Sequence, residues 1–285
     1  MLRRWIVVIE DLVVEHLRIK FEIDKTLVGT PNLCKLEIYN LNESNRNKIK
    51  DKYQNIEIYA GYEDNMPLIF KGQIRTVNSV YSGVDWVTII YAGDGALALE
   101  TAKVNKTFPA GTNTDTMVGA LITELGAVGG VAKGQLEGIK KCLSGKASLL
   151  KTLIMSGGVK EWLDILAKNC GFTYSVNDGV IETNTKGTSL KDEPEFIINQ
   201  KSGMIGSPEI TEVGASCTVY LRGELKLARR FKIESISATL NVGNQNYRKV
   251  NKTIGENTYM IQSIKHIGDT HSNDWKTEIT GIISR

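Results

Sequence analysis

Residues 16–23 read HLRIKFEI, a strict alternation of polar and apolar side chains. Successive side chains of a β-strand point to opposite faces of the sheet. The apolar residues that would share one face are Leu17, Ile19, Phe21 and Ile23. The stretch therefore predicts a strand with one buried face.

The same alternation continues through the first hundred residues. Further strands are expected at 1–8, 34–38, 56–60, 68–80 and 84–91, the last two forming a long hairpin around Ser82-Gly83. A polar stretch at 43–52 without a β-branched run predicts one short helix. Five or six antiparallel strands with short turns favour closure into a barrel or sandwich, which protects the sheet edges.

The middle of the chain has a different periodicity. Apolar residues between Met117 and Leu125 recur at helical spacing behind Asn113 and Thr114, with Gly126 as the expected stop. A second amphipathic helix is expected over 159–170, with Trp162 in its core stripe, followed by a hairpin around Asn177-Asp178-Gly179. The glycine-rich stretch 126–145 predicts irregular structure.

Alternation returns after a charged linker at 186–195. Strands are expected at 217–221, 231–236, 258–267 and 275–283, with turns at Gly203, Gly206 and Pro208 and a polar loop at 243–251. The fold class is thus mainly β with an α/β insertion: two tube-like antiparallel β-barrels flanking a small α/β module. The expected domains are 1–100, 101–195 and 196–285.

One short internal sequence repeat, which we call the Trp-x-Thr-x-Ile echo, occurs in both β regions. Residues 86–90 and 275–279 both read Trp-x-Thr-x-Ile, and each follows a strand of similar pattern, at 74–77 and 261–264. A short echo can arise by chance between strands with one buried face. It nevertheless makes duplication of a barrel plausible.

Composition excludes several classes of protein. The 285 residues carry a formal charge of +3, and no apolar run approaches the ~20 residues of a membrane-spanning helix. Residues 1–9 lack a signal-peptide pattern, so we interpret them as a strand. A small net charge does not indicate a nucleic-acid binder. The densest basic cluster, which we interpret as a solvated strand edge, is Arg222, Lys226, Arg229, Arg230 and Lys232.

The chain also lacks the usual patterns of catalysis. Its cysteines are Cys34, Cys142, Cys170 and Cys217, spaced as neither a disulfide framework nor a zinc site, which favours reduced cytoplasmic folding. The three histidines form no metal motif, and we interpret the segment between His266 and His271 as a turn stabilised by Asp269. Residues 202–207 lack the context of a nucleophilic serine, and no phosphate-binding loop is present. We therefore expect no catalytic residue, no cofactor and no metal.

The order of these segments resembles the hub proteins of contractile phage baseplates, the Mu-like and larger myophage central hubs. The residues that carry the likeness are IYNL (38–41), AGY (60–62), IFKGQI (69–74), SGMIGSP (202–208), VYLR (219–222) and YMIQSIKHIGD (259–269), followed by Trp275 and Thr277. Each fragment is generic β sequence. Their order around the helical module is more specific.

The resemblance implies a structural protein, not an enzyme, located in the virion at the tail baseplate after assembly in the host cytoplasm. It implies a homotrimer whose six barrels imitate a sixfold ring, which adapts the tail tube to a threefold spike. The implied partners are the tail tube or tube-initiator protein, the central spike, the tape measure protein and the baseplate wedge. DNA would only pass through the channel, and no membrane insertion is implied.

Two alternatives remain open from the sequence. One is a tail-associated peptidoglycan hydrolase, since carboxylate pairs can meet only in the fold. The other is an OB-like barrel that binds glycan or nucleic acid, for which Tyr59, Tyr62 and Trp86 are the candidate aromatic residues.

Overall fold

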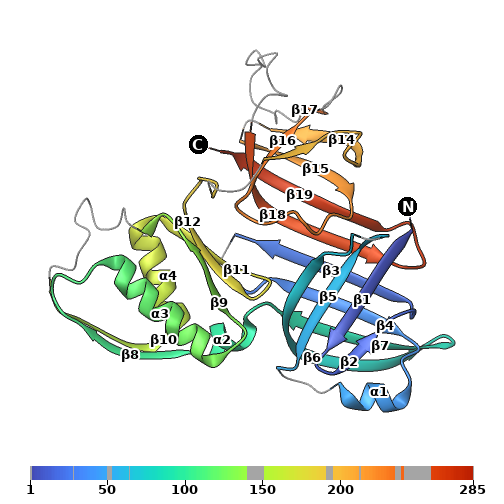
Figure 1. Ribbon diagram of the computed structural model, residues 1–285, viewed down its shortest axis with the longest axis horizontal. Coiled ribbons are helices and arrows are strands. Elements are labelled where there is room, and N and C mark those ends of the chain that lie inside the picture. Colours follow the sequence, from blue (N-terminus) through green and yellow to red (C-terminus); the bar gives the residue numbers. More distant parts are fainter. Residues whose placement is uncertain are drawn as a thin grey trace.

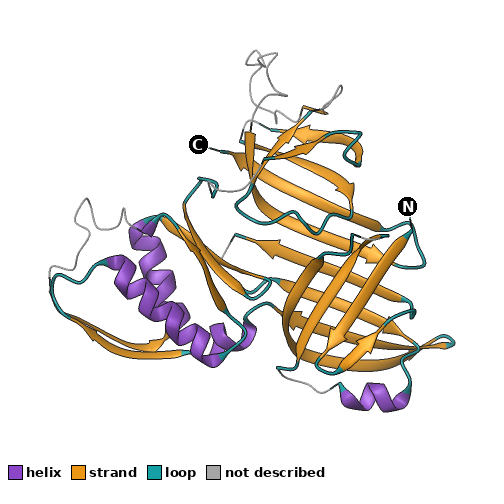
Figure 2. Ribbon diagram, in the orientation of Figure 1, coloured by secondary structure: helices purple, strands orange, loops and turns teal. Residues whose placement is uncertain are grey.

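The computed structural model shows a chain dominated by antiparallel strands, with helices confined to one side module and one connecting turn (Figures 1 and 2). The described residues are 2–27, 29–49, 53–63, 65–139, 151–190, 195–211, 213–234, 239–240 and 258–284. The prediction of a mainly β fold with an α/β insertion is confirmed.

The first β region winds around a core of buried apolar side chains. Its elements are β1 (Arg3–Ile9), β2 (Leu12–Val14), β3 (Ile19–Thr26), β4 (Leu33–Tyr39), α1 (Glu43–Lys48), β5 (Asn55–Tyr62), β6 (Leu68–Ser82) and β7 (Asp85–Gly93). Ile19, Phe21 and Ile23 are buried as the alternation predicts. The strand begins at Ile19 and not at His16, because His16 has a positive φ of 64° and turns the chain.

The middle module packs its helices against two small sheets. Its elements are α2 (Ala96–Thr101), β8 (Lys103–Phe108), α3 (Thr114–Val128), β9 (Ala132–Leu136), β10 (Leu153–Gly158), α4 (Val159–Cys170), β11 (Phe172–Asn177) and β12 (Val180–Thr185). One sheet pairs β8 with β10, and the other has the order β11-β12-β9. In Figure 1 the helices and the β8–β10 ribbon project away from the two β regions.

Two expectations for this module are wrong. Helix α3 continues through Gly126 and ends at Gly129, whose φ of 101° suits only glycine. The stretch expected to be irregular contains β9. This strand is stabilised by parallel pairing with β12, a distant segment, so its local sequence does not reveal it. Its remainder, 140–145, lies outside the described residues.

The second β region contains the remaining strands. They are β13 (Phe196–Ile198), β14 (Met204–Ile210), β15 (Gly214–Tyr220), β16 (Arg230–Ile233), β17 (Thr239–Leu240), β18 (Thr258–Asp269) and β19 (Trp275–Ile283). Gly206 and Pro208 lie inside β14 and not at turns, because β14 bulges there and its register with β15 shifts between Ile205 and Glu209. The loop expected at 243–251 lies outside the described residues.

The two β regions share one continuous sheet. Strand β3 pairs antiparallel with β18 from Thr26↔Ser263 to Lys20↔Asp269, which gives the order β17-β14-β15-β19-β18-β3-β4-β7-β6-β5-β1-β2. The alternation patterns predict two separate sheets, and the pairing of strands so far apart in the sequence is not visible in them. We call the β3–β18 pairing the central joint.

A four-strand unit occurs twice along this sheet. The first unit has the spatial order β3-β4-β7-β6 and the second has β14-β15-β19-β18. In both units, the neighbours across the sheet are the first, second, fourth and third strands of the unit along the chain. Each long hairpin carries a register shift at a matching place, between Ile74 and Thr76 in β6 and between Ile261 and Ser263 in β18. The Trp-x-Thr-x-Ile echo falls at corresponding places in β7 and β19.

Close packing at the central joint is testable at Gly268, which pairs with Phe21. A Cβ built at Gly268 would lie 2.2 Å from the Phe21 ring. We expect Gly268→Ala to lower the free energy of unfolding by about 1–3 kcal/mol through overpacking. The matched control is Gly119→Ala in α3, where a Cβ meets nothing within 4 Å and helix propensity should raise stability by about 1 kcal/mol. Equal effects of both substitutions in urea unfolding would contradict this packing.

Candidate functional site

Three polar joints hold the two β regions and the middle module in fixed positions. The central joint connects the two β regions, a second joint connects the first β region to the β11–β12 turn, and a third connects the second β region to β12. These joints and the surfaces that they orient are the candidate functional features of the described residues.

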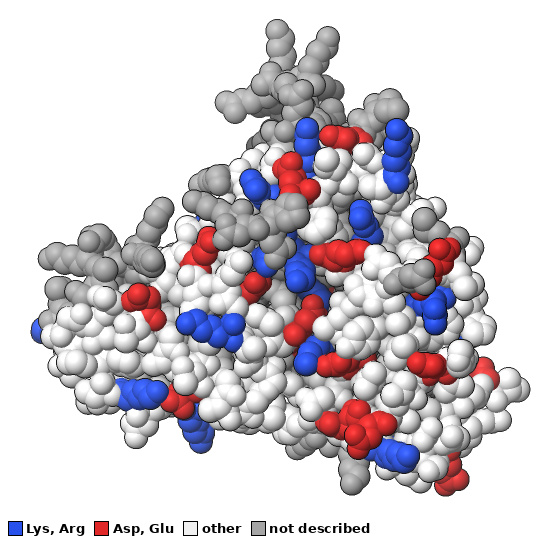
Figure 3. Space-filling view, in the orientation of Figure 1, with Lys and Arg blue, Asp and Glu red and all other residues white. Residues whose placement is uncertain are grey.

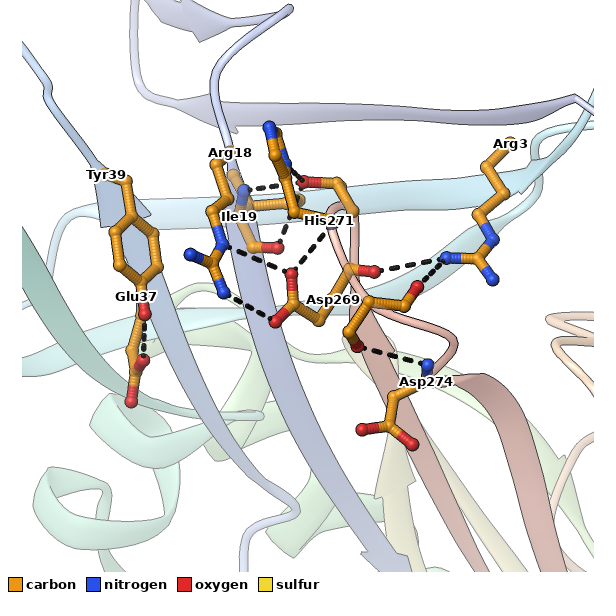
Figure 4. Close-up of polar contacts among 10 residues, drawn as sticks. Arg3, Arg18, Ile19, Glu37, Tyr39, Asp269, His271 and Asp274 are labelled. Atoms are coloured by element: carbon orange, nitrogen blue, oxygen red, sulfur yellow. Dashed lines mark hydrogen bonds and ion pairs between the residues drawn. The ribbon is translucent and has the colours of Figure 1, made fainter.

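An arginine clamp closes the central joint (Figure 4). Arg18 donates to both carboxylate oxygens of Asp269, with Nη2–Oδ2 at 2.9 Å and Nε–Oδ1 at 3.3 Å. The Arg18 guanidinium also lies 4.4 Å from the centroid of the Tyr39 ring. Two-pronged arginine–carboxylate contacts fix orientation as well as distance. The clamp thus locks the start of β3 to the end of β18.

The same turn is held from the N-terminal strand. Arg3 in β1 donates to the backbone carbonyls of Asp269 and Ser272, and its guanidinium lies 5.5 Å from the Trp275 ring centroid. The backbone N–H of His271 donates to Asp269 Oδ1 at 2.9 Å, which confirms the predicted aspartate-stabilised turn. Burial opposes ionisation of Asp269, but the hydrogen bonds from Arg18 and His271 outweigh it and hold its pKa below the usual range.

The second joint is a buried ionic network. Lys25 points to the core side of β3, and its Nζ lies 2.7 and 2.8 Å from the two carboxylate oxygens of Asp178. Asp94, fully buried after β7, accepts hydrogen bonds from the backbone N–H groups of Asp178 and Gly179. The tight β11–β12 turn is therefore held against the first β region by the Lys25–Asp178 ion pair and by the Asp94 carboxyl group.

An asparagine extends this network. Asn32 Nδ2 donates to the carbonyl of Val176 at 2.7 Å, and its Oδ1 accepts from the Thr26 backbone at 3.0 Å. Burial and the nearby Asp178 carboxylate raise the pKa of Asp94 to about 7, although Lys25 and the two backbone donors oppose the rise. The joint thus contains a carboxyl group that titrates near neutral pH.

The third joint contradicts our interpretation of the basic cluster as a solvated edge. Arg229 is 3% exposed, and its Nη2 lies 3.0 Å from Glu182 Oε1 on β12. Arg222 and Lys232 do lie at the surface, where Glu224 and Glu234 pair with them. One member of the cluster therefore has a structural role that its spacing does not reveal.

The histidines and the serine segment do not form a site. His266 is buried with its Nδ1 2.9 Å from Thr277 Oγ1, and burial holds its pKa well below the usual range. His16 lies at an exposed turn, and Ser202 exchanges hydrogen bonds with Asn199 within a turn. Among the described residues there is no group of three or more metal-binding side chains. The described helices also include none that is long and apolar enough to cross a membrane.

The candidate aromatic residues do not share one binding face. Tyr59 donates to Glu57, and Tyr62 packs at the border of the two β regions with its hydroxyl 3.4 Å from the Trp275 carbonyl. Trp86 is at the far end of the β6–β7 hairpin, between the Arg46 guanidinium and the Tyr81 ring. Trp162 packs against the core of the middle module, as predicted.

The cysteines are only partly as expected. Cys34 and Cys217 are free and buried, and burial raises the pKa of the Cys217 thiol to about 12. Cys170, at the end of α4, is disulfide-bonded, so the expectation of reduced cysteines without a disulfide framework is wrong at this position. Cys142 lies outside the described residues.

The solvent face of the shared sheet carries charges that neutralise one another. The ion pairs on this face are Lys35–Glu37, Lys71–Glu57, Lys265–Glu22, Lys265–Asp24 and Lys276–Glu278. On the face shown in Figure 3, blue and red side chains are interspersed without a large area of one colour. Such a surface has little long-range attraction for either sign of charge.

Sequence reasoning missed the joints for identifiable reasons. Lys25 lies two residues beyond the alternation at 16–23, and continuing that alternation places it on the same face as Ile23 and Phe21. A lysine at a core position is a signal for a buried partner. Asp94 and Arg229 offer no such signal, because they lie just outside the alternating stretches and no pattern marks them as core positions.

Comparison with known proteins identifies relatives of this architecture. A family model described as baseplate hub gp41 matches residues 6–248. A 43 kDa tail protein of prophage MuSo2 from Shewanella oneidensis superposes with a TM-score of 0.63 at 10% identity, over 99% of each chain. A tail protein from Neisseria meningitidis MC58 gives a TM-score of 0.63 at 9% identity, over 99% of this chain and 97% of that one.

A third neighbour comes from a secretion system. The E. coli c3393 protein, described as a type VI secretion component structurally similar to the T4 tail proteins gp27 and gp5, gives a TM-score of 0.62 at 10% identity, over 98% of this chain and 77% of that one. No curated protein sequence matches the chain. At these identities the structural neighbours establish a shared fold.

Titration of Asp94 should be measurable as a pH-dependent stability. Its pKa is higher in the folded chain than the ~3.9 of a free aspartate, so its contribution is present below about pH 4 and is lost as the pH rises through about 7. We expect the stability of the wild type minus that of Asp94→Asn to fall by up to about 4 kcal/mol over this range. Urea unfolding at several pH values measures this difference. A difference between the wild type and Asp94→Asn that stays flat with pH would contradict the assignment.

The arginine clamp should contribute more than an ordinary surface ion pair. Arg18→Met leaves the nearly buried Asp269 carboxylate without its main partner, and we expect a loss of about 1–3 kcal/mol in the free energy of unfolding. Lys35→Met, which removes a more exposed pair with Glu37 in the same sheet, should cost about 0–1 kcal/mol. A similar loss of stability for both variants in chemical denaturation would contradict a larger contribution of the Arg18–Asp269 clamp.

Proposed function

The chain belongs to the baseplate hub gp41 family, and from this premise we propose that three copies form a ring at the centre of a contractile phage tail baseplate. The ring would adapt the sixfold tail tube to the threefold central spike and enclose the channel for tape measure protein and DNA. Its role is structural and its working parts are surfaces, not a catalytic cleft.

The observation that carries this proposal is the repeated four-strand unit. Units β3-β4-β7-β6 and β14-β15-β19-β18 lie side by side in one sheet, joined through β3 and β18. Three copies would present six such units, so one face of the ring could match a sixfold neighbour while the whole keeps threefold symmetry. Three hydrophobic clusters that lie mainly within 1–100, 101–195 and 196–285 support the proposed division into these domains, although Leu221 and Trp275 belong to the first cluster and Leu27 and Leu190 to the third.

The self-paired charges support a channel role for the solvent face of the shared sheet. Lys265 contacts both Glu22 and Asp24 across the central joint, so its charge is compensated within the sheet. A channel through which DNA passes should hold it weakly, because several unpaired cations would bind phosphates strongly. We assign this face to the inside of the ring.

The partners follow from this placement. We propose that one rim contacts the tail tube or tube-initiator protein and the other the central spike, with the wedge proteins outside. The middle module, which projects from the two β regions in Figure 1, would face outward toward those wedge proteins. The protein would act in the virion after assembly in the host cytoplasm.

Mass and image measurements test the ring. We expect the purified chain, at high concentration, to have three times the monomer mass by light scattering and to show threefold rings by negative-stain microscopy. Zymography on peptidoglycan should show no clearing. A protein that stays monomeric at all concentrations would overturn the ring, and cleavage of cell wall would overturn the structural role.

A further inference from the structure

The second joint holds one cation and two carboxyl groups in the interior of the protein. Lys25 is 4% exposed and is paired with Asp178, and Asp94 is fully buried at the same turn. We propose that this joint is a pH-sensitive latch on the middle module: a proton on Asp94 keeps the β11–β12 turn against the first β region, and its loss lets the turn open. Such a latch acts within a single chain and does not depend on the proposed ring.

The charge balance of the joint depends on that single proton. Lys25 places its Nζ 2.7 and 2.8 Å from the two oxygens of Asp178, so its charge is already matched by one carboxylate. With Asp94 protonated the three side chains together are neutral, and with Asp94 ionised they carry one uncompensated negative charge. A buried charge without a partner is costly, whereas the same carboxylate in water is well solvated. Ionisation of Asp94 therefore favours a conformation in which water reaches the joint.

Hydrogen bonds from the turn offset this charge only in part. The backbone N–H groups of Asp178 and Gly179 both donate to the Asp94 carboxyl group, the latter at 2.9 Å. Burial and the Asp178 carboxylate raise the pKa of Asp94 to about 7, against the opposing effects of Lys25 and of these two donors. The group that titrates is thus bonded directly to the backbone of the turn that it holds.

The cations near the joint are already paired with other carboxylates. In the described part of the chain, the charged side chains that act on Asp94 are Asp178 and Lys25. Two more cations pass beside the joint on β6, each in an ion pair of its own: Lys71–Glu57 and Arg75–Glu100. The polar neighbours Asn32, Asn177 and Ser175 are neutral. Protonation of Asp94 is thus what balances the joint.

Two titratable groups on neighbouring strands face Lys25 and stay neutral. Burial, with a smaller effect of Lys25, holds the pKa of His266 on β18 well below its usual range. Burial also raises the pKa of the Cys34 thiol on β4, although Lys25 opposes this rise. Neither group supplies a charge that could replace the proton on Asp94.

The turn can open without opening a hydrophobic core. It bonds to the first β region through Lys25, Asp94 and Asn32, the last of which donates to the Val176 carbonyl at 2.7 Å. The first β region and the middle module have separate clusters of buried apolar side chains. The third joint independently ties β12 to the second β region. Opening of the second joint is therefore a local event, of the kind that folded proteins undergo without unfolding.

The direction of the pH effect follows from the two environments of Asp94. Its pKa is about 7 in the closed joint and about 3.9 when the turn is open and the carboxyl group is in water. The closed joint is favoured most below about pH 4, and this advantage is lost as the pH rises to about 7. The ratio of open to closed turn should rise about tenfold per pH unit over this interval and level off above it, which gives about 80-fold between pH 5 and pH 8.

Hydrogen exchange at the turn measures this opening. The amides of Asp178 and Gly179 are bonded to Asp94, so we expect their open-to-closed ratio, corrected for intrinsic exchange rates, to rise about 80-fold from pH 5 to pH 8 in NMR spectra. Low concentrations of urea should change this ratio little, because a local opening exposes little surface. The control is the Gly171 amide, bonded to the Ala167 carbonyl at the end of α4, which should show no such rise.

Three variants separate the proton on Asp94 from a general weakening of the joint. Asp94→Asn should abolish the rise, because an amide does not ionise. Asp178→Asn leaves Asp94 as the remaining carboxyl group beside Lys25, so the rise should fall below about tenfold; asparagine tolerates the φ of 53° at this position. The matched control, Asn32→Ala, removes the bond to the Val176 carbonyl and should increase opening at every pH with the same rise.

The outcomes that would overturn the latch are specific. One is a flat pH profile at the two turn amides of the wild type, and another is an equal rise in the wild type and in Asp178→Asn. A third is a rise with the same urea dependence as the most protected amides of the β3–β18 ladder, since that would be unfolding of the whole chain. If Asp94→Asn does not fold by circular dichroism, the comparison of the wild type with Asp178→Asn and Asn32→Ala decides.

Discussion

The backbone ladder between β3 and β18 is the constraint on which the rest of the structure depends. It joins two units built from distant parts of the chain into one sheet, so that the position of each unit fixes the position of the other. Backbone hydrogen bonds alone would allow the strands to slide by two residues. The Arg18–Asp269 clamp and the Phe21–Gly268 contact remove that freedom, because each fits only one register.

The buried joints favour a defined geometry over maximal stability. A buried ion pair such as Lys25–Asp178 loses the hydration of both charges, and the pairing often only offsets that cost. Its value lies in specificity, since a mispositioned β11–β12 turn would leave the Lys25 charge buried without a partner. Asp94 adds to this by holding the backbone of the turn itself. The buried joint thus fixes the position of the middle module relative to the first β region.

The sequence predicts elements well and joints poorly, for a physical reason. Alternation and glycine positions encode local backbone conformation, and they located β3, the β6–β7 hairpin, α4 with its stop at Gly171, and the Asp178-Gly179 turn. Pairing partners depend on contacts between segments up to about 250 residues apart, as for Arg18 and Asp269. The bulge in β14 shows the intermediate case: Gly206 and Pro208 were recognised as interruptions, but the sheet continues through them.

The two versions of the four-strand unit differ most in their outer strands. Strand β3, in the first unit, pairs with β18 without a register shift from Thr26 to Lys20. Strand β14, in the second unit, is interrupted by a bulge and by Pro208, which lacks a backbone donor. An interrupted strand is a poor template for pairing with a copy of itself, and bulges and prolines are usual protections of a strand against aggregation. The same unit therefore provides a regular strand where the two β regions join and an irregular one at its other occurrence, so a repeated strand order does not require a repeated role for each strand.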